Sequence, residues 1–90
     1  EVPPIDGIYG IAYPIPTTGL ITLELTVPEN GDYKVIIYDF FGKQQGVYNK
    51  KFFSGYVSFR VDVRDLATGI YLLQVTNGRF VKTFKIIKNG

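Results

Sequence analysis

The chain has 90 residues, enough for one small domain, with 46% hydrophobic residues, 20% charged residues and a formal net charge of +2. The high apolar content excludes a disordered chain, and so small a charge gives no reason to expect nucleic acid as a partner. Cysteine and histidine are absent, which excludes disulfides, Ser–His and Cys–His catalysis and the usual zinc ligand sets.

The first residues are typical of a linker because two prolines precede any regular pattern. We assign residues 1–12 to this linker, with a short first strand near Ile8–Tyr13, and residues 13–90 to one folded domain. No window approaches the roughly 20 apolar residues of a membrane-spanning helix, so we do not expect the chain to span a membrane.

Alternation of apolar and polar side chains predicts a half-buried strand over Leu20–Val27. The next run, Tyr33–Tyr38, is apolar on both faces except at Lys34, which predicts a central strand. If these two strands pair directly, a five-residue loop opposes Leu25 to Val35, and a slip of one residue would turn every side chain to the other face.

A turn over residues 39–43, with a positive φ at Gly42, leads to a weaker strand over Gln44–Phe53. Residues Tyr56–Val63 then alternate cleanly. Residues 65–69 are expected to form a connection that includes one helical turn.

The clearest hairpin joins Ile70–Thr76 to Arg79–Ile87 through Asn77-Gly78, the pair preferred in a two-residue type I′ turn. Such a turn places Val75 opposite Phe80, Leu73 opposite Lys82 and Tyr71 opposite Phe84. Seven strands separated by turns at this spacing predict an all-β fold, an immunoglobulin-like antiparallel β-sandwich.

The remaining chemical groups point away from catalysis. Asp62 and Asp65 lie close in sequence, but neighbouring arginines favour a surface ion-pair cluster over a calcium or acid–base site. The run 50–53 places two lysines beside two phenylalanines, a weak nucleic-acid pattern, and one phenylalanine is expected in the core. We therefore expect no enzyme activity, no cofactor, no metal and no nucleic-acid partner.

Four segments, in order, resemble the type A C-terminal sorting domain of the Bacteroidota type IX secretion system. They are Tyr13-Pro14-Ile15-Pro16-Thr17-Thr18-Gly19, the turn after Tyr38 that contains Asp39, Gly42 and Lys43, the strand opening Leu66-Ala67-Thr68-Gly69-Ile70-Tyr71, and the terminal Lys85-Ile86-Ile87-Lys88. Ile15 stands where the family usually has asparagine, and Asn89-Gly90 extends beyond its typical end.

The resemblance implies a secretion signal that directs an upstream cargo through the periplasm and across the outer membrane. The partners implied are an outer-membrane translocon and a sortase-like transpeptidase that attaches the cargo to the cell surface; other cargo is released. The alternative is a retained immunoglobulin-like docking or adhesion module, and a weak dimer through edge strands is the self-association considered.

The same resemblance implies recognition roles for the motif positions Pro14, Pro16, Gly19, Tyr38, Asp39, Gly42, Lys43, Gly69, Tyr71, Lys85, Ile86, Ile87 and Lys88. For the prolines, glycines and Tyr71, folding is the competing role, because turns and a buried aromatic explain them equally well. The segment Lys85–Lys88 is where we expect recognition, through an exposed strand edge with alternating positive charge that adds to a partner's sheet.

Overall fold

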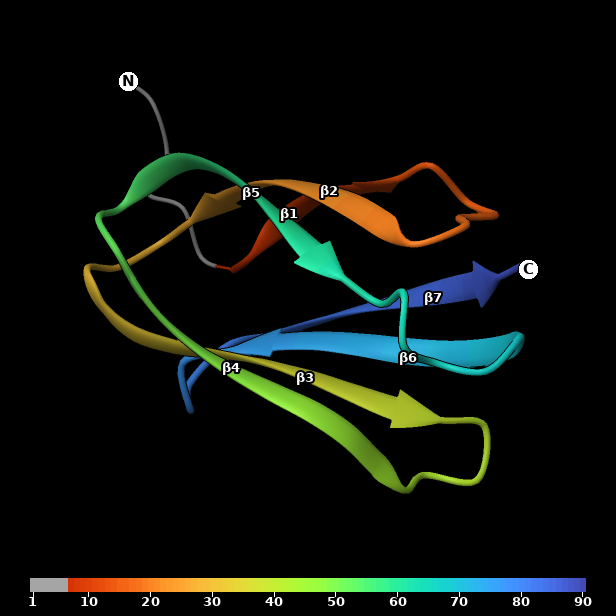
Figure 1. Ribbon diagram of the computed structural model, residues 1–90. Coiled ribbons are helices and arrows are strands. Elements are labelled where there is room, and N and C mark those ends of the chain that lie inside the picture. The colour runs from red at the N-terminus through yellow and green to blue at the C-terminus, as the bar shows by residue number, and fades with distance from the viewer. Residues whose placement is uncertain (1–6) are drawn as a thin grey trace.

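The computed structural model describes residues 7–90, which form seven antiparallel strands in two facing sheets and no helix (Figure 1). The strands are β1 (Tyr9–Tyr13), β2 (Leu20–Val27), β3 (Gly31–Asp39), β4 (Gln44–Phe52), β5 (Gly55–Asp62), β6 (Gly69–Thr76) and β7 (Val81–Lys88). One sheet, here sheet A, has the order β1-β2-β5, and the other, sheet B, has the order β4-β3-β6-β7. The predicted seven-stranded β-sandwich is confirmed. Of the linker expected over residues 1–12, positions 1–6 lie outside the described residues and positions 9–12 belong to β1.

The direct pairing considered for the second and third strands does not occur. Strand β2 lies between β1 and β5, whereas β3 lies between β4 and β6, because residues 28–30 carry the chain from one sheet to the other. Leu25 and Val35 are therefore not cross-strand partners, but both are fully buried in the core between the sheets.

The hairpin between β6 and β7 has a register shifted by two residues from the prediction. Asn77 Oδ1 accepts hydrogen bonds from the backbone amides of Arg79 and Phe80, both at 2.9 Å, so the loop extends through Phe80. A shift of two residues keeps every side chain on its expected face. The observed partners are Val75 with Lys82, Leu73 with Phe84, and Tyr71 with Ile86.

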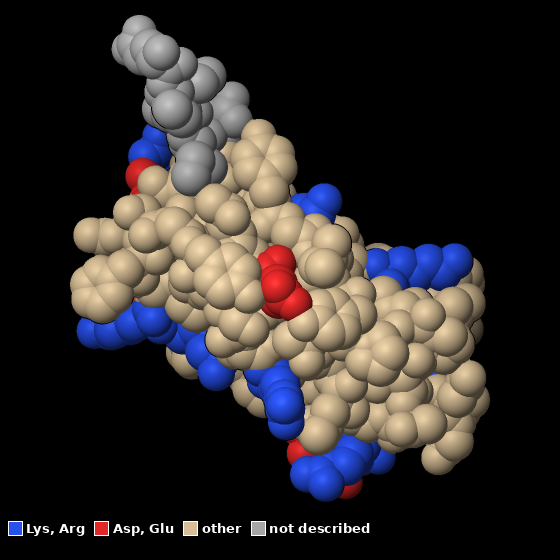
Figure 2. Space-filling model, turned by 90° about the horizontal axis from the view of Figure 1, so that it is seen from above, with Lys and Arg blue, Asp and Glu red and all other residues tan. Residues whose placement is uncertain are grey.

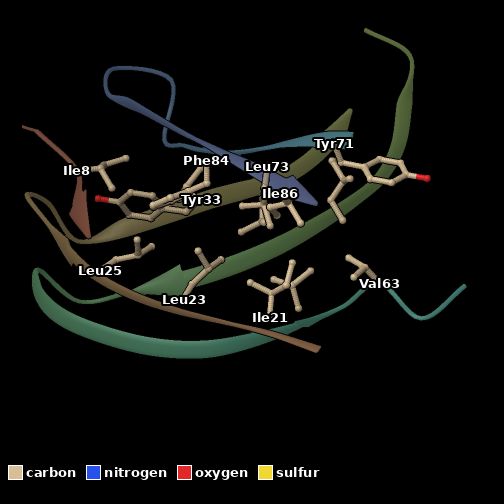
Figure 3. Packing of buried hydrophobic residues seen from close by; sticks show 14 of the residues in the cluster. Ile8, Ile21, Leu23, Leu25, Tyr33, Val63, Tyr71, Leu73, Phe84 and Ile86 are labelled. Carbon is tan, nitrogen blue, oxygen red and sulfur yellow. The ribbon is translucent and has the colours of Figure 1, made fainter. Parts of the chain in front are cut away.

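The core consists of side chains from the inner faces of both sheets (Figure 3). Alternate residues of β2 are buried, as predicted, and they pack against alternate residues of β3, β6 and β7. Burying each such Val, Leu or Ile side chain contributes about 1.5–3 kcal/mol. Phe52 of β4 is half-buried and stacks on Tyr33 with ring centroids 5.1 Å apart, whereas Phe53 is exposed.

The connection between β5 and β6 contains no helical turn, so that expectation was wrong. The amide of Leu66 donates to the carbonyl of Val63 at 3.0 Å, which closes a single β-turn. The chain then runs without regular structure to Gly69, where β6 begins.

Candidate functional site

The four segments singled out in the sequence meet at one end of the sandwich, here called the motif end. Strands β1, β3, β5 and β7 end there and β2, β4 and β6 begin there (Figure 1). The pairing shows the convergence directly: Gly69 lies opposite Lys88, and Thr17 forms a parallel bridge with the same Lys88. Residues from both ends of the sequence therefore contribute to one small region.

Thr17 of the first segment is 2% exposed and forms hydrogen bonds in several directions. Its amide donates to the carbonyl of Ile87 at 2.9 Å, and its carbonyl accepts from the amide of Asn89 at 2.8 Å. Its hydroxyl donates to the carbonyl of Leu20 at 2.9 Å and accepts from the amide of Gly19 at 3.1 Å. Sequence reasoning missed this role, although a hydroxyl residue at this place belongs to the motif.

The residues around Thr17 have different exposures. Pro14 and Pro16 are exposed, and the peptide bonds that precede them are both cis. Gly19 is buried, its carbonyl accepts from the amide of Val63 at 2.7 Å, and an added Cβ would lie 2.3 Å from Cγ of Arg64. Gly19 thus allows the first segment to approach the loop after β5 closely.

Asp39 organises the turn between β3 and β4. Its Oδ1 accepts from the amides of Phe41 and Lys43, both at 2.9 Å, and its Oδ2 accepts from Gln45 Nε2 at 3.0 Å. The hydrogen bond from the Lys43 amide is the main reason that the pKa of Asp39 lies below its usual value. Gly42 has a φ of +84°, as the turn predicted. The folded turn leaves Phe41 92% exposed.

Tyr71 and Lys88 bind the connection that precedes β6. Tyr71 is buried at the edge of the core, its hydroxyl points away from that core (Figure 3), and it donates to the carbonyl of Ala67 at 2.6 Å. Lys88 is only 2% exposed, and its Nζ donates to the carbonyl of Leu66 at 3.2 Å. Tyr71 thus holds this loop to β6, and Lys88 holds it to β7, the last strand.

The burial of Lys88 corrects the expectation of an exposed, alternately charged terminal strand. Ile86 and Lys88 face the core, whereas Lys85 is exposed and Ile87 half-buried on the outer face of sheet B. The edge of the strand is also closed at its end, because Thr17 takes the hydrogen bonds that a partner strand would need. Of Lys85 and Lys88, only Lys85 exposes its side chain to solvent.

The outer face of sheet B carries further motif residues beside Lys85. Tyr38 lies opposite Leu72, and Leu72 lies opposite Lys85, so the three form one cross-strand row. Ile70 lies opposite Ile87 in the next row of this face. The motif positions therefore divide into an outward group and an inward group.

Asp62, the last residue of β5, forms an ion pair with Arg64, whereas the ion pairs within residues 7–90 do not include Asp65, so the expected cluster is found only in part. Asp62 Oδ2 accepts from Arg64 Nη2 at 2.7 Å. This side-chain hydrogen bond is the main cause that lowers the pKa of Asp62 to about 2. No group of three or more metal-ligating residues occurs within residues 7–90. In the same part of the chain, no helix is long and apolar enough to cross a membrane.

Two comparisons with known proteins give matches. A family model described as "Secretion system C-terminal sorting domain" matches residues 11–89. The crystal structure of dimeric latent PorU from Porphyromonas gingivalis is similar in fold, with a TM-score of 0.67 and 18% identity; the match covers 98% of this chain and 10% of PorU. At this identity the likeness concerns the fold alone. A search of curated proteins gives no match.

Proposed function

The chain belongs to the family of secretion system C-terminal sorting domains, the family that its motifs indicated, and we propose that it acts as a folded address label for type IX secretion. The match over residues 11–89 is the observation that carries this proposal. In this role an outer-membrane translocon recognises the domain and exports an upstream cargo from the periplasm. A sortase-like transpeptidase then removes the domain and attaches the cargo to the cell surface.

The arrangement of the strands supports such a label. Strand β1 begins at the end of the sandwich opposite the motif end, while β7 finishes at the motif end (Figure 1). A cargo joined ahead of β1 leaves the motif end accessible to a large receptor. A label must satisfy this condition, because the receptor and the cargo otherwise compete for space.

The exposures suggest which motif residues are read. We assign direct contact to the exposed residues of the motif end: Pro14, Pro16, Phe41, Lys43 and Lys85. Gly19, Tyr71, Ile86 and Lys88 act by building this end, because each is buried among the segments that meet there. Recognition then depends on a folded surface in which Lys43 and Lys85 are the charged residues.

A secretion assay tests the proposal. Residues 1–90 are fused behind a periplasmic reporter in a Bacteroidota host that has the type IX system, and the reporter is measured in periplasm, cell surface and medium. We expect export that is lost in a host without the translocon. A wild-type fusion that stays in the periplasm of the competent host would overturn the proposal.

Matched variants test the assignment of contacts. Phe41→Ala and Phe53→Ala remove phenylalanines that are 92% and 82% exposed, but Phe53 follows β4 at the end opposite the motif end. Lys85→Gln and Lys51→Gln make the same comparison for exposed lysines. We expect loss of export only for Phe41→Ala and Lys85→Gln. Equal export of all four would show that this surface is not read.

The size of the exported reporter separates the proposed fate from the alternative. Cleavage by a transpeptidase leaves a surface product that lacks the domain, and an immunoblot with two antibodies, one for each part, detects the difference. Surface reporter that retains the intact domain would instead support a retained docking or adhesion module.

A further inference from the structure

The outer face of sheet A carries a regular grid of side chains, of which only Tyr13 belongs to a sorting motif. Glu24 is at its centre, between Ile11 of β1 and Ser58 of β5. The row on one side is Tyr9, Thr26 and Tyr56, and the row on the other is Tyr13, Thr22 and Arg60. Seen over this sheet, Figure 2 shows an acidic group surrounded by uncharged surface, with basic groups toward the rim.

Two tyrosines at the corners of the grid reach the central carboxylate. The hydroxyl of Tyr13 donates to Oε2 of Glu24, and the hydroxyl of Tyr56 donates to Oε1 at 2.9 Å. Tyr13 and Tyr56 remain 41% and 66% exposed, so their rings border the carboxylate without covering it. Both phenolic protons are used within the cluster.

The polar atoms that the Glu24 carboxylate and the two phenols leave for a ligand are therefore acceptors. A carboxylate offers about four lone-pair positions, of which the tyrosines take two, and each phenolic oxygen keeps a lone pair. The hydrogen bond from Tyr13, followed by that from Tyr56, lowers the pKa of Glu24, so the carboxylate carries its charge at neutral pH. The centre is anionic, rich in acceptors and bordered by aromatic rings.

The negative charge is not neutralised by an ion pair within residues 7–90. The ion pairs there join Asp62 to Arg64 and Glu29 to Arg79. Arg60, at the fourth corner of the grid, affects the pKa of Tyr13 but makes no ion pair with Glu24. The carboxylate of Glu24 can therefore form an ion pair with a cationic group of a ligand.

We propose that the outer face of sheet A is a docking surface for a partner protein, which inserts an arginine side chain between Tyr13 and Tyr56 onto the carboxylate of Glu24. A guanidinium group only donates hydrogen bonds, binds carboxylates in a planar fork and stacks on aromatic rings, so it matches every feature of this centre. The exposed apolar side chains of Ile11 and Leu20 provide contacts for the surroundings of that arginine.

A sugar is the other ligand that aromatic residues suggest, and it fits less well. A polyol both donates and accepts hydrogen bonds, whereas the hydroxyls of Tyr13 and Tyr56 already donate to Glu24 and have no proton left for a sugar oxygen. The charge of the carboxylate also favours a cation over a neutral ring. The inference does not depend on the sorting role, since the grid lies on the outer face of sheet A and shares only Tyr13 with the motif segments.

The experiment is an NMR titration of the ¹⁵N-labelled chain with a capped tripeptide that has arginine between two leucines. We expect saturable shifts of backbone amides in β1, β2 and β5, centred on Glu24. The same peptide with citrulline, which has nearly the same shape but no charge, gives no saturable shift. Equal binding of both peptides, or no saturable shift by 10 mM (an order-of-magnitude limit for a single charged anchor), overturns the proposal.

Variants of the grid make the test specific. Glu24→Gln keeps an acceptor for tyrosine and removes the charge, so affinity for the arginine peptide falls about five- to tenfold. Arg60→Gln removes a competing cation, so affinity for the arginine peptide rises. Asp62→Asn changes an acid that is already paired with Arg64, so affinity for the peptide stays within about twofold of the wild type. Unchanged affinity in folded Glu24→Gln contradicts the proposal, and so does an equal loss in Asp62→Asn. Tighter binding of a neutral mannan or glucan hexasaccharide on the same amides would replace it with a glycan site.

Discussion

The hydroxyl of Thr17 gives the sharpest test of how the motif end is held together. Thr17→Val preserves the shape of the side chain and deletes the bond to the carbonyl of Leu20 and the bond from the amide of Gly19. Because Thr17 is 2% exposed, water does not readily replace these partners. Leaving a buried polar group unsatisfied costs about 1–3 kcal/mol, and we expect about 2 kcal/mol here.

The assay is equilibrium unfolding in urea, followed by circular dichroism, together with a thermal scan. For a domain of this size, 1 kcal/mol lowers Tm by roughly 4–8 °C, so Thr17→Val should lower Tm by about 8–16 °C. The neighbouring Thr18 is exposed, and Thr18→Val should change stability by less than about 0.5 kcal/mol. If the two variants unfold at the same urea concentration, the hydroxyl of Thr17 does not hold the motif end.

Three further predictions concern the same end of the molecule. Lys88→Met keeps the buried stem and should leave the free energy of unfolding within about 1 kcal/mol of the wild type. Lys88→Ala opens a cavity and should cost about 2–4 kcal/mol in the same urea assay. Similar losses in both variants would show that the ammonium group dominates. Gly42→Ala places a side chain at a φ of +84° and should lower the free energy of unfolding by about 1 kcal/mol. The control is Gly46→Ala, where an added Cβ makes only ordinary contacts. Equal melting temperatures of the two variants would contradict this prediction. The pKa of Asp62 falls from 3.8 to about 2 on folding, so its stabilising effect is complete above pH 4 and is lost as the pH falls toward 2. The Tm difference between the wild type and Asp62→Asn should therefore shrink over that range. A constant Tm difference would refute this prediction.

The sequence was sufficient for the strands and, except at Lys88, for the direction in which their side chains point. Period-two alternation along β2 identified its buried face, because inward and outward positions differ in polarity throughout. The pattern could not identify which strands are neighbours. Leu25 and Val35 are buried whether their strands pair within one sheet or pack across two, so burial alone cannot distinguish these arrangements.

The hairpin register and the burial of Lys88 were mispredicted for different physical reasons. Asn77-Gly78 favours a two-residue turn, but hydrogen bonds from the amides of Arg79 and Phe80 to the side chain of Asn77 stabilise a longer loop. Lysine is seldom buried, so its charge suggested exposure. Its long apolar stem lies in the core here, and the nearby carbonyl of Leu66 that accepts a hydrogen bond from its ammonium group is identified only in the folded chain.

The parallel bridge between Thr17 and Lys88 has a consequence for maturation of the protein. Thr17 lies between two strands of sheet A and Lys88 lies in sheet B, so the two become neighbours only when both sheets have closed. An incompletely folded domain therefore lacks the complete surface. A receptor that binds this surface would consequently select folded domains over unfolded ones.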